Sequence, residues 1–170
     1  MVCNSDDIID SRDIIKRIEE LTELKDAVEE AKAAVEEAKA ALEEAKLAVE
    51  DESDVGADDN LSNAEDFLSD TEDTLSDAEA EFGDDEQEEL VTLEALADEA
   101  ASSPDWRYGE TLISESYFTE YARQFADDIG AIDGNAAWPC NHIDWEAAAD
   151  ELKQDYMSVD FGGETYLIHA

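Results

Sequence analysis

An apolar residue every seven positions is the feature that most constrains the fold of this chain. The series is Ile14, Leu21, Val28, Val35, Leu42 and Val49. Three residues after four of its members come Leu24, Ala31, Ala38 and Ala45. Such spacing is the a/d pattern of a coiled coil, and it predicts one helix over residues 10–50, about 60 Å long. The pairs Glu29–Lys32, Glu36–Lys39 and Glu43–Lys46 are spaced to support that helix locally.

A second heptad series follows a polar turn. Residues 51–60 predict the turn, with Gly56 as the helix breaker and Asn60 as the N-cap of the next helix. The second series is Leu61, Ala64, Leu68, Thr71, Leu75, Ala78 and Phe82. Gly83 ends it, and a third helix is expected over 85–101, with Leu90, Leu93, Leu96 and Ala100 on one face. Residues 1–104 therefore predict an antiparallel helical hairpin, a coiled-coil arm.

The remaining residues, 105–170, predict a small α+β module. Ser114 is expected to cap a helix over 115–129 whose inner face carries Phe118, Tyr121, Ala122, Phe125 and Ile129. Asp144 is expected to cap a second helix, with Trp145, Ala148, Leu152 and Tyr156 turned inward. A β-hairpin is expected across Gly162-Gly163. The predicted fold class is mainly α, an arm followed by two helices and a C-terminal β-hairpin.

The charge of the chain is large and unevenly placed. The 170 residues include 50 acids and 10 bases, a formal net charge of −40. Residues 1–46 hold 14 acids and 7 bases, residues 47–106 hold 23 acids and no base, and residues 107–170 hold 13 acids and 3 bases. Like charges one helical turn apart destabilise a helix, so something other than stability has shaped the stretch without bases.

This charge excludes several classes of function. Phosphate backbones and anionic membrane surfaces both repel such a surface, so direct nucleic-acid or membrane binding is not expected. We expect a cytoplasmic protein, since no apolar run is long enough to span a membrane and the N-terminal residues lack the pattern of a secretion signal. Cys3 and Cys140 have neither metal-site nor disulfide-framework spacing and are expected to be reduced thiols.

The sequence offers little for catalysis or for cofactors. Cys140, His142 and Asp144 form a possible trio, but an anionic setting does not activate a thiol. Residues 51–60 are rich in oxygen ligands and do not follow the EF-hand order. We therefore expect no enzymatic activity, no cofactor and no dedicated metal site.

Eighteen acids in 39 positions form the candidate partner-binding site. They are Asp51, Glu52, Asp54, Asp58, Asp59, Glu65, Asp66, Asp70, Glu72, Asp73, Asp77, Glu79, Glu81, Asp84, Asp85, Glu86, Glu88 and Glu89. A hairpin about 60 Å long that carried the whole net charge would hold about one charge per 1.5 Å, and B-DNA carries about one per 1.7 Å. This match favours imitation of a DNA duplex. An acid-rich surface adapted to high salt is the competing interpretation, although the first 46 residues keep seven bases.

Two segments of the last module resemble a known family. Residues 115–130 and 143–156, with the ending Phe161 to Tyr166, resemble the C-terminal part of ArdA-type antirestriction proteins and related phage or plasmid accessory proteins. The similarity covers about 60 of 170 residues. It implies a protein of a mobile element that presents a DNA-like acidic surface to restriction–modification enzymes, often as a dimer.

The sequence as a whole predicts a non-enzymatic inhibitor that occupies the DNA-binding channel of a host defence enzyme, such as a restriction–modification or CRISPR enzyme. A homodimer is expected, because the a/d series of the first helix offers more apolar surface than the shorter second helix covers. Two alternatives remain open. One is an acidic coiled-coil scaffold or adaptor, and the other is an acidic chaperone of basic DNA-binding proteins.

Overall fold

The fold is mainly helical, with one small antiparallel sheet. A computed structural model describes residues 3–50, 56–132, 138 and 140–170, and helix makes up 71% of it. The expected fold class is confirmed to this extent. In chain order the elements are β1 (Ile8–Asp10), α1 (Ser11–Glu50), α2 (Ala57–Glu81), α3 (Asp84–Ala100), α4 (Trp106–Gly109), β2 (Thr111–Ser114), α5 (Phe118–Asp128), the 3-10 turn η1 (Cys140–His142), α6 (Trp145–Leu152), the 3-10 turn η2 (Lys153–Asp155), β3 (Tyr156–Phe161) and β4 (Glu164–His169).

The chain divides into two compact units. The arm unit is Glu19–Leu90, and the sheet unit combines residues 1–18 with residues 91–170. This division differs from the predicted one at residue 104. The N-terminal residues belong to the sheet unit because β1 pairs with β2, about a hundred residues further along the chain.

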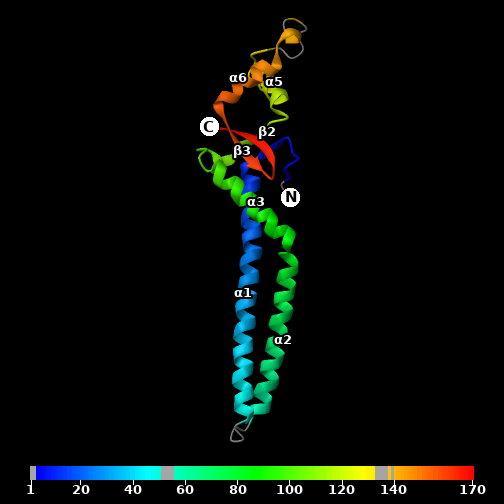
Figure 1. Ribbon diagram of the computed structural model, residues 1–170, viewed down its shortest axis with the longest axis vertical. Coiled ribbons are helices and arrows are strands. Elements are labelled where there is room, and N and C mark those ends of the chain that lie inside the picture. The colour runs from blue at the N-terminus through cyan, green and yellow to red at the C-terminus, as the bar shows by residue number, and fades with distance from the viewer. Residues whose placement is uncertain (1–2, 51–55, 133–137, 139) are drawn as a thin grey trace. The chain divides into compact units, whose positions relative to one another are not determined.

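In the arm unit the two heptad series form the inner faces of their helices. Every member of both series within the unit is buried or half-buried. On α2 the residues outside the series are exposed, apart from the buried Ala57 at the helix start. Within this unit α2 runs back beside α1 (Figure 1). Each helix thus turns one apolar stripe inward and its charged residues outward, as amphipathic helices do.

The sheet unit is built on four antiparallel strands in the order β1-β2-β4-β3. The expected C-terminal hairpin is present, and Gly162 and Gly163 form its turn with φ angles of 58° and 89°. Positive φ at both turn residues suits the type I′ geometry that joins twisted strands. β1 and β2 were not predicted, because each is only three or four residues long.

The central strand β4 is covered on both faces. Its run Tyr166-Leu167-Ile168 is buried throughout. Leu167 and Ile113 pack against Phe118 and Ala122 of α5 and Ala149 of α6. Toward the other edge, Glu99 of α3 accepts a 2.9 Å hydrogen bond from the backbone N–H of Asp160 on β3. The sheet unit therefore has an apolar core of its own.

Four local expectations are wrong, and one of them concerns Tyr156, which was expected on the inner face of a helix but begins β3 because α6 ends at Leu152. Ser114 does not cap a helix, because Thr111-Leu112-Ile113-Ser114 is a strand between β1 and β4, and α5 begins at Phe118. Asn60 is not an N-cap either. α2 begins at Ala57, and the preceding Gly56 holds a left-handed φ of 113° that favours glycine.

The fourth error concerns the inner face of α5. Phe125 and Ile129 are exposed, and the buried residues of α5, Phe118 and Ala122, lie in its first two turns. By contrast, the cap at Asp144 is confirmed: its Oδ1 accepts a 3.1 Å hydrogen bond from the N–H of Ala147. The third helix is also close to expectation, and Leu90, Leu93, Leu96 and Ala100 are all buried.

Candidate functional site

Most of the candidate acids lie on α2 and on the start of α3. Asp51, Glu52 and Asp54 fall outside the described residues. Asp58 and Asp59 open α2, and Asp84, Asp85 and Glu86 open α3, followed by Glu88 and Glu89. The rest of the set follows along α2: Glu65, Asp66, Asp70, Glu72, Asp73, Asp77, Glu79 and Glu81. All these described positions belong to one compact unit.

The carboxylates of α2 are exposed and make no ion pair with a Lys or Arg of the described chain. Each acidic residue of this helix is classed as exposed. Within the described part of the chain, no Lys or Arg forms an ion pair with any of them. The acids of α2 outnumber the bases of the arm unit, and their mutual repulsion is a cost to the fold.

The four bases of the arm unit are all on α1, and three of them pair within that helix. The Nζ atoms of Lys32, Lys39 and Lys46 lie 3.3, 2.9 and 3.0 Å from carboxylate oxygens of Glu29, Glu36 and Glu43. These are the three pairs predicted from the sequence, and they are confirmed. The lysine side chains are about half exposed and the glutamates about three-quarters exposed, so solvent screening keeps the contribution of each pair to the helix small.

Some of the acids also have a local structural role. Glu86 Oε2 accepts a 3.1 Å hydrogen bond from the N–H of Gly83, as in a capping box at the start of α3. Asp58, Asp59, Asp84 and Asp85 lie in first turns, where a negative charge is favoured by the helix dipole. The acids in the middle of α2 are away from the helix start, so neither of these explanations applies to them.

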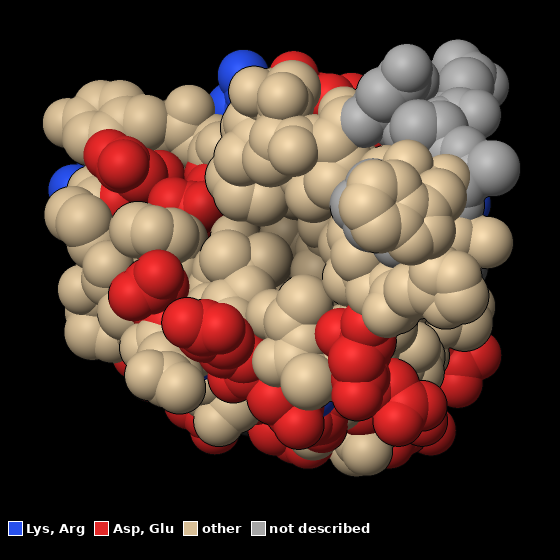
Figure 2. Space-filling model, turned by 90° about the horizontal axis from the view of Figure 1, so that it is seen from above, with Lys and Arg blue, Asp and Glu red and all other residues tan. Residues whose placement is uncertain are grey.

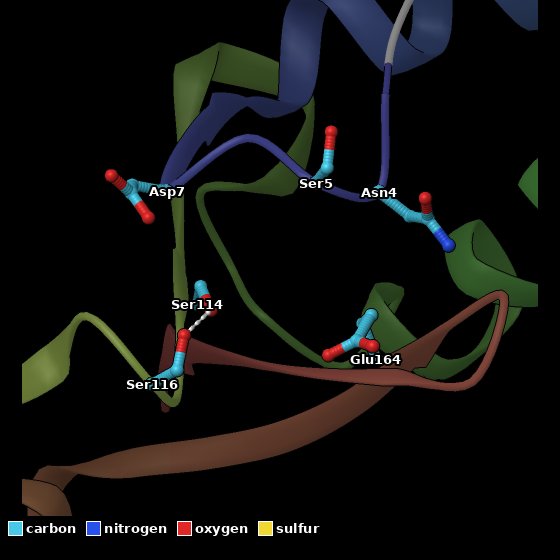
Figure 3. A pocket seen from close by; sticks show the side chains of 6 residues that line it. All are labelled: Asn4, Ser5, Asp7, Ser114, Ser116 and Glu164. Carbon is cyan, nitrogen blue, oxygen red and sulfur yellow. Dashed lines mark hydrogen bonds between the residues drawn. The ribbon is translucent and has the colours of Figure 1, made fainter.

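The sheet unit holds a polar pocket that the sequence did not predict. Its volume is about 270 Å³, and it is lined by Asn4, Ser5, Asp7, Ser114, Ser116 and Glu164. The hydroxyls of Ser114 and Ser116 face each other at 2.9 Å, and the carboxylate of Glu164 turns toward them (Figure 3). The β1–β2–β4 pairing brings together residues more than a hundred positions apart, so no sequence motif could have shown it.

This pocket lacks the groups of a hydrolytic site. Its lining includes neither histidine nor lysine that could activate a serine. In the possible trio of Cys140, His142 and Asp144, the carboxylate of Asp144 is engaged as the cap of α6. Among the described residues, no group of three or more His, Cys, Asp and Glu is placed to hold a metal ion.

The face seen in Figure 2 carries carboxylates along one side and apolar or neutral side chains over its centre, with only a few Lys or Arg atoms at its rim. The sheet unit is acidic as well, since residues 1–18 and 91–170 together hold 21 acids and 6 bases. It also exposes large apolar side chains, among them Ile129 and Trp138.

No helix in the described part of the chain is long and apolar enough to cross a membrane. Comparisons with known proteins found no matching family model, no similar curated protein and no similar solved structure.

Proposed function

We propose that this protein is a DNA mimic, an inhibitor that occupies the DNA-binding channel of a host defence enzyme. One observation carries the proposal: the carboxylates of α2 are exposed on a regular helix, and no Lys or Arg of the described chain lies within 4.0 Å of them. A channel built for phosphates presents Lys and Arg side chains, and these bind carboxylates through the same charge-assisted hydrogen bonds.

The charge density of the arm unit supports this proposal. Residues 19–90 hold 29 acids and 4 bases, a net charge of −25. The part of α1 in this unit, 32 residues, spans about 48 Å, so the unit carries about one net charge per 1.9 Å. B-DNA carries about one per 1.7 Å. The value of about 1.5 Å assigned the whole net charge to the arm, and the two values lie on either side of that of DNA at about the same distance from it.

The proposal includes a rigid support for the charges. We infer that α1 and α2 pair as an antiparallel coiled coil, since the buried stripe of each helix has heptad spacing. Rigid carboxylates suit a mimic better than a flexible acidic tail, because less conformational entropy is lost on binding. The field of the array would also speed association with a positive channel.

The kind of enzyme is proposed from the resemblance of residues 115–130 and 143–156 to antirestriction proteins. Restriction–modification enzymes are therefore the first candidates, and CRISPR effectors and other DNA-targeting nucleases with positive channels come next. In this proposal the protein derives from a phage or another mobile element. The expected homodimer remains a prediction.

The test is competition with duplex DNA. A fluorescently labelled duplex is first bound to a purified restriction methyltransferase or CRISPR effector, and the protein is then added while anisotropy is recorded. The proposal expects the duplex to be displaced, and it expects affinity to fall steeply as ionic strength rises. Two negative results together would contradict the proposal. The first is that the protein displaces the duplex from none of the enzymes tested. The second is that a pull-down from host lysate yields no partner that competing DNA elutes.

A scaffold is the second candidate, and one observation favours it. Leu47 on α1 is 66% exposed and Phe67 on α2 is 47% exposed, so the arm unit shows apolar as well as charged surface. Contacts made through these residues would survive about 0.5 M salt, because apolar burial is insensitive to screening. A partner retained at that salt concentration and not released by duplex DNA would favour the scaffold.

A further inference from the structure

The residues that flank the buried stripes of the arm unit are basic on one flank of α1 and acidic on the equivalent flank of α2. On α1, the residue four positions after each of Leu21, Val28, Val35 and Leu42 is a lysine, giving the series Lys25, Lys32, Lys39 and Lys46. On α2, the residue four positions after each of Leu61, Leu68 and Leu75 is a glutamate, giving Glu65, Glu72 and Glu79. The opposite flank of α1 holds alanine at every heptad, namely Ala27, Ala34, Ala41 and Ala48.

The direction of pairing decides which flanks meet. When two coiled-coil helices run antiparallel, equivalent flanks lie opposite each other, so the lysine flank of α1 would face the glutamate flank of α2. When they run parallel, opposite flanks meet, and in a pair of α1 helices Lys32, Lys39 and Lys46 would face alanines. Charges at these flanking positions set partner choice and orientation in coiled coils.

The structure agrees with the antiparallel arrangement. α1 and α2 lie side by side in one unit with their stripes buried or half-buried (Figure 1). The pKa of Lys39 is raised, chiefly by the hydrogen bond and charge of Glu36 on its own helix and further by the charge of Glu72 on α2. If Lys39 lies opposite Glu72, one heptad in either direction places Lys46 opposite Glu65 and Lys32 opposite Glu79.

We propose that Lys32, Lys39 and Lys46 with Glu79, Glu72 and Glu65 form a charged seam that fixes the antiparallel register of α1 and α2 within one chain. The same seam disfavours parallel pairing of α1 with α1 of a second copy. This role rests on the antiparallel pairing inferred under the proposed function and does not require binding to an enzyme. It assigns three of the candidate acids to the fold of the arm unit.

A charge-swap experiment on the full chain tests the seam. In the first variant, Lys32→Glu, Lys39→Glu and Lys46→Glu, the thermal midpoint of the circular dichroism signal at 222 nm should fall, because like charges then face each other. Tryptophan fluorescence serves as the internal control, since Trp106, Trp138 and Trp145 all lie in the sheet unit and its midpoint should stay unchanged.

Rescue distinguishes a seam from a change in net charge. When Glu65→Lys, Glu72→Lys and Glu79→Lys are added to the first variant, most of the fall in its thermal midpoint at 222 nm should be reversed. The matched control adds Asp66→Lys, Asp70→Lys and Asp73→Lys, with the same charge change on the same helix but outside the flank, and should recover clearly less. Equal recovery by the two sets, or no fall in the first variant, would overturn the seam. Should that variant not fold, the milder set Lys32→Gln, Lys39→Gln and Lys46→Gln gives the same comparison.

Melting at several protein concentrations tests the pairing within one chain, and sedimentation gives the oligomeric state. The 222 nm midpoint of the wild-type protein should not depend on protein concentration, because α1 pairs with α2 of its own chain and not with α1 of a second copy. A dimer whose 222 nm midpoint rises with concentration, and which the first variant leaves intact, would overturn the proposal. None of these results depends on binding to an enzyme, so they fail separately from the DNA-mimic proposal.

Discussion

At the scale of single residues, the sheet unit depends on a few polar contacts placed around an apolar core. Tyr166 is fully buried, and its hydroxyl donates a 2.6 Å hydrogen bond to the backbone carbonyl of Asp6. Ser11 is buried too, and its hydroxyl accepts a 2.8 Å hydrogen bond from the N–H of Glu110. Both contacts attach the N-terminal segment to residues about a hundred or more positions away, which explains how it becomes part of the sheet.

Removing the cap of α6 should weaken the sheet unit. Asp144→Ala deletes the oxygen that accepts from Ala147, and loss of an N-cap costs about 1 kcal/mol. Denaturant unfolding followed by tryptophan fluorescence measures the free energy. Asp150→Ala, an exposed acid on the same helix, is the matched control and should leave the free energy of unfolding nearly unchanged. Equal losses in the two variants would contradict the cap.

The sheet unit should lose stability in alkali above pH 10. Burial is the main cause that raises the pKa of Tyr166 from 10.0 to about 12, with nearby acids adding to it. Between these values the unfolded chain releases the proton while the folded chain keeps it, so the free energy of unfolding falls as pH rises and levels off near pH 12. The pKa of Tyr156 is raised too, mainly by burial, and acts in the same direction.

Unfolding measured from pH 8 to 12 by tryptophan fluorescence checks this dependence. Tyr166→Phe should flatten the decline above pH 10, whereas Tyr108→Phe, at a side chain that is 79% exposed, should keep the wild-type decline. A decline of the same size in all three proteins would show that Tyr166 is not responsible.

At the scale of elements, a helix or strand could be predicted from the sequence only where its apolar pattern repeats several times. The helix over 10–50 and its stripe were predictable, because five heptads leave little choice of period. β1 and β2 were not, since strands of three or four residues carry too short a pattern and their pairing joins residues far apart in the chain. The pocket around Ser114 depends on that pairing and was missed for the same reason.

The candidate acids were visible in the sequence, but their local roles were not. The exposed positions along α2 follow directly from the heptad series, because everything outside the stripe faces solvent. The hydrogen bond from the N–H of Gly83 was needed to show that Glu86 caps α3. The start of α2 at Ala57 rather than Leu61 also required the backbone angle of Gly56.

Salt should stabilise the arm unit. Its net charge of −25 repels itself, and raising the ionic strength from about 0.05 to about 1 M shortens the screening length from roughly 14 to about 3 Å. The thermal midpoint at 222 nm should therefore rise more than the midpoint of tryptophan fluorescence. Choline chloride at equal ionic strength is the control and should act like sodium chloride. A midpoint that does not rise, or that rises only with sodium, would contradict general charge repulsion.

At the scale of the whole molecule, the two proposals divide the acids of α2 between partner binding and folding. Asp66→Asn, Asp70→Asn and Asp73→Asn remove three charges outside the flank and should weaken binding to the enzyme by about tenfold, by analogy with exposed ion pairs worth roughly 0.2–1 kcal/mol each. Glu65→Gln, Glu72→Gln and Glu79→Gln remove the same charge from the same helix and should mainly lower the 222 nm midpoint. Binding isotherms and melting curves of both variants check this division.

The most direct test of the DNA-mimic proposal is displacement of a labelled duplex from a DNA-targeting enzyme that the wild-type protein inhibits. The comparison protein carries Asp58→Asn, Asp59→Asn, Asp66→Asn, Asp70→Asn, Asp73→Asn, Asp77→Asn and Glu81→Gln, which leaves the flank glutamates and the apolar stripe in place. The account predicts that the wild-type protein displaces the duplex and that this variant, folded by its 222 nm signal, does not. Equal displacement by the two proteins would contradict it.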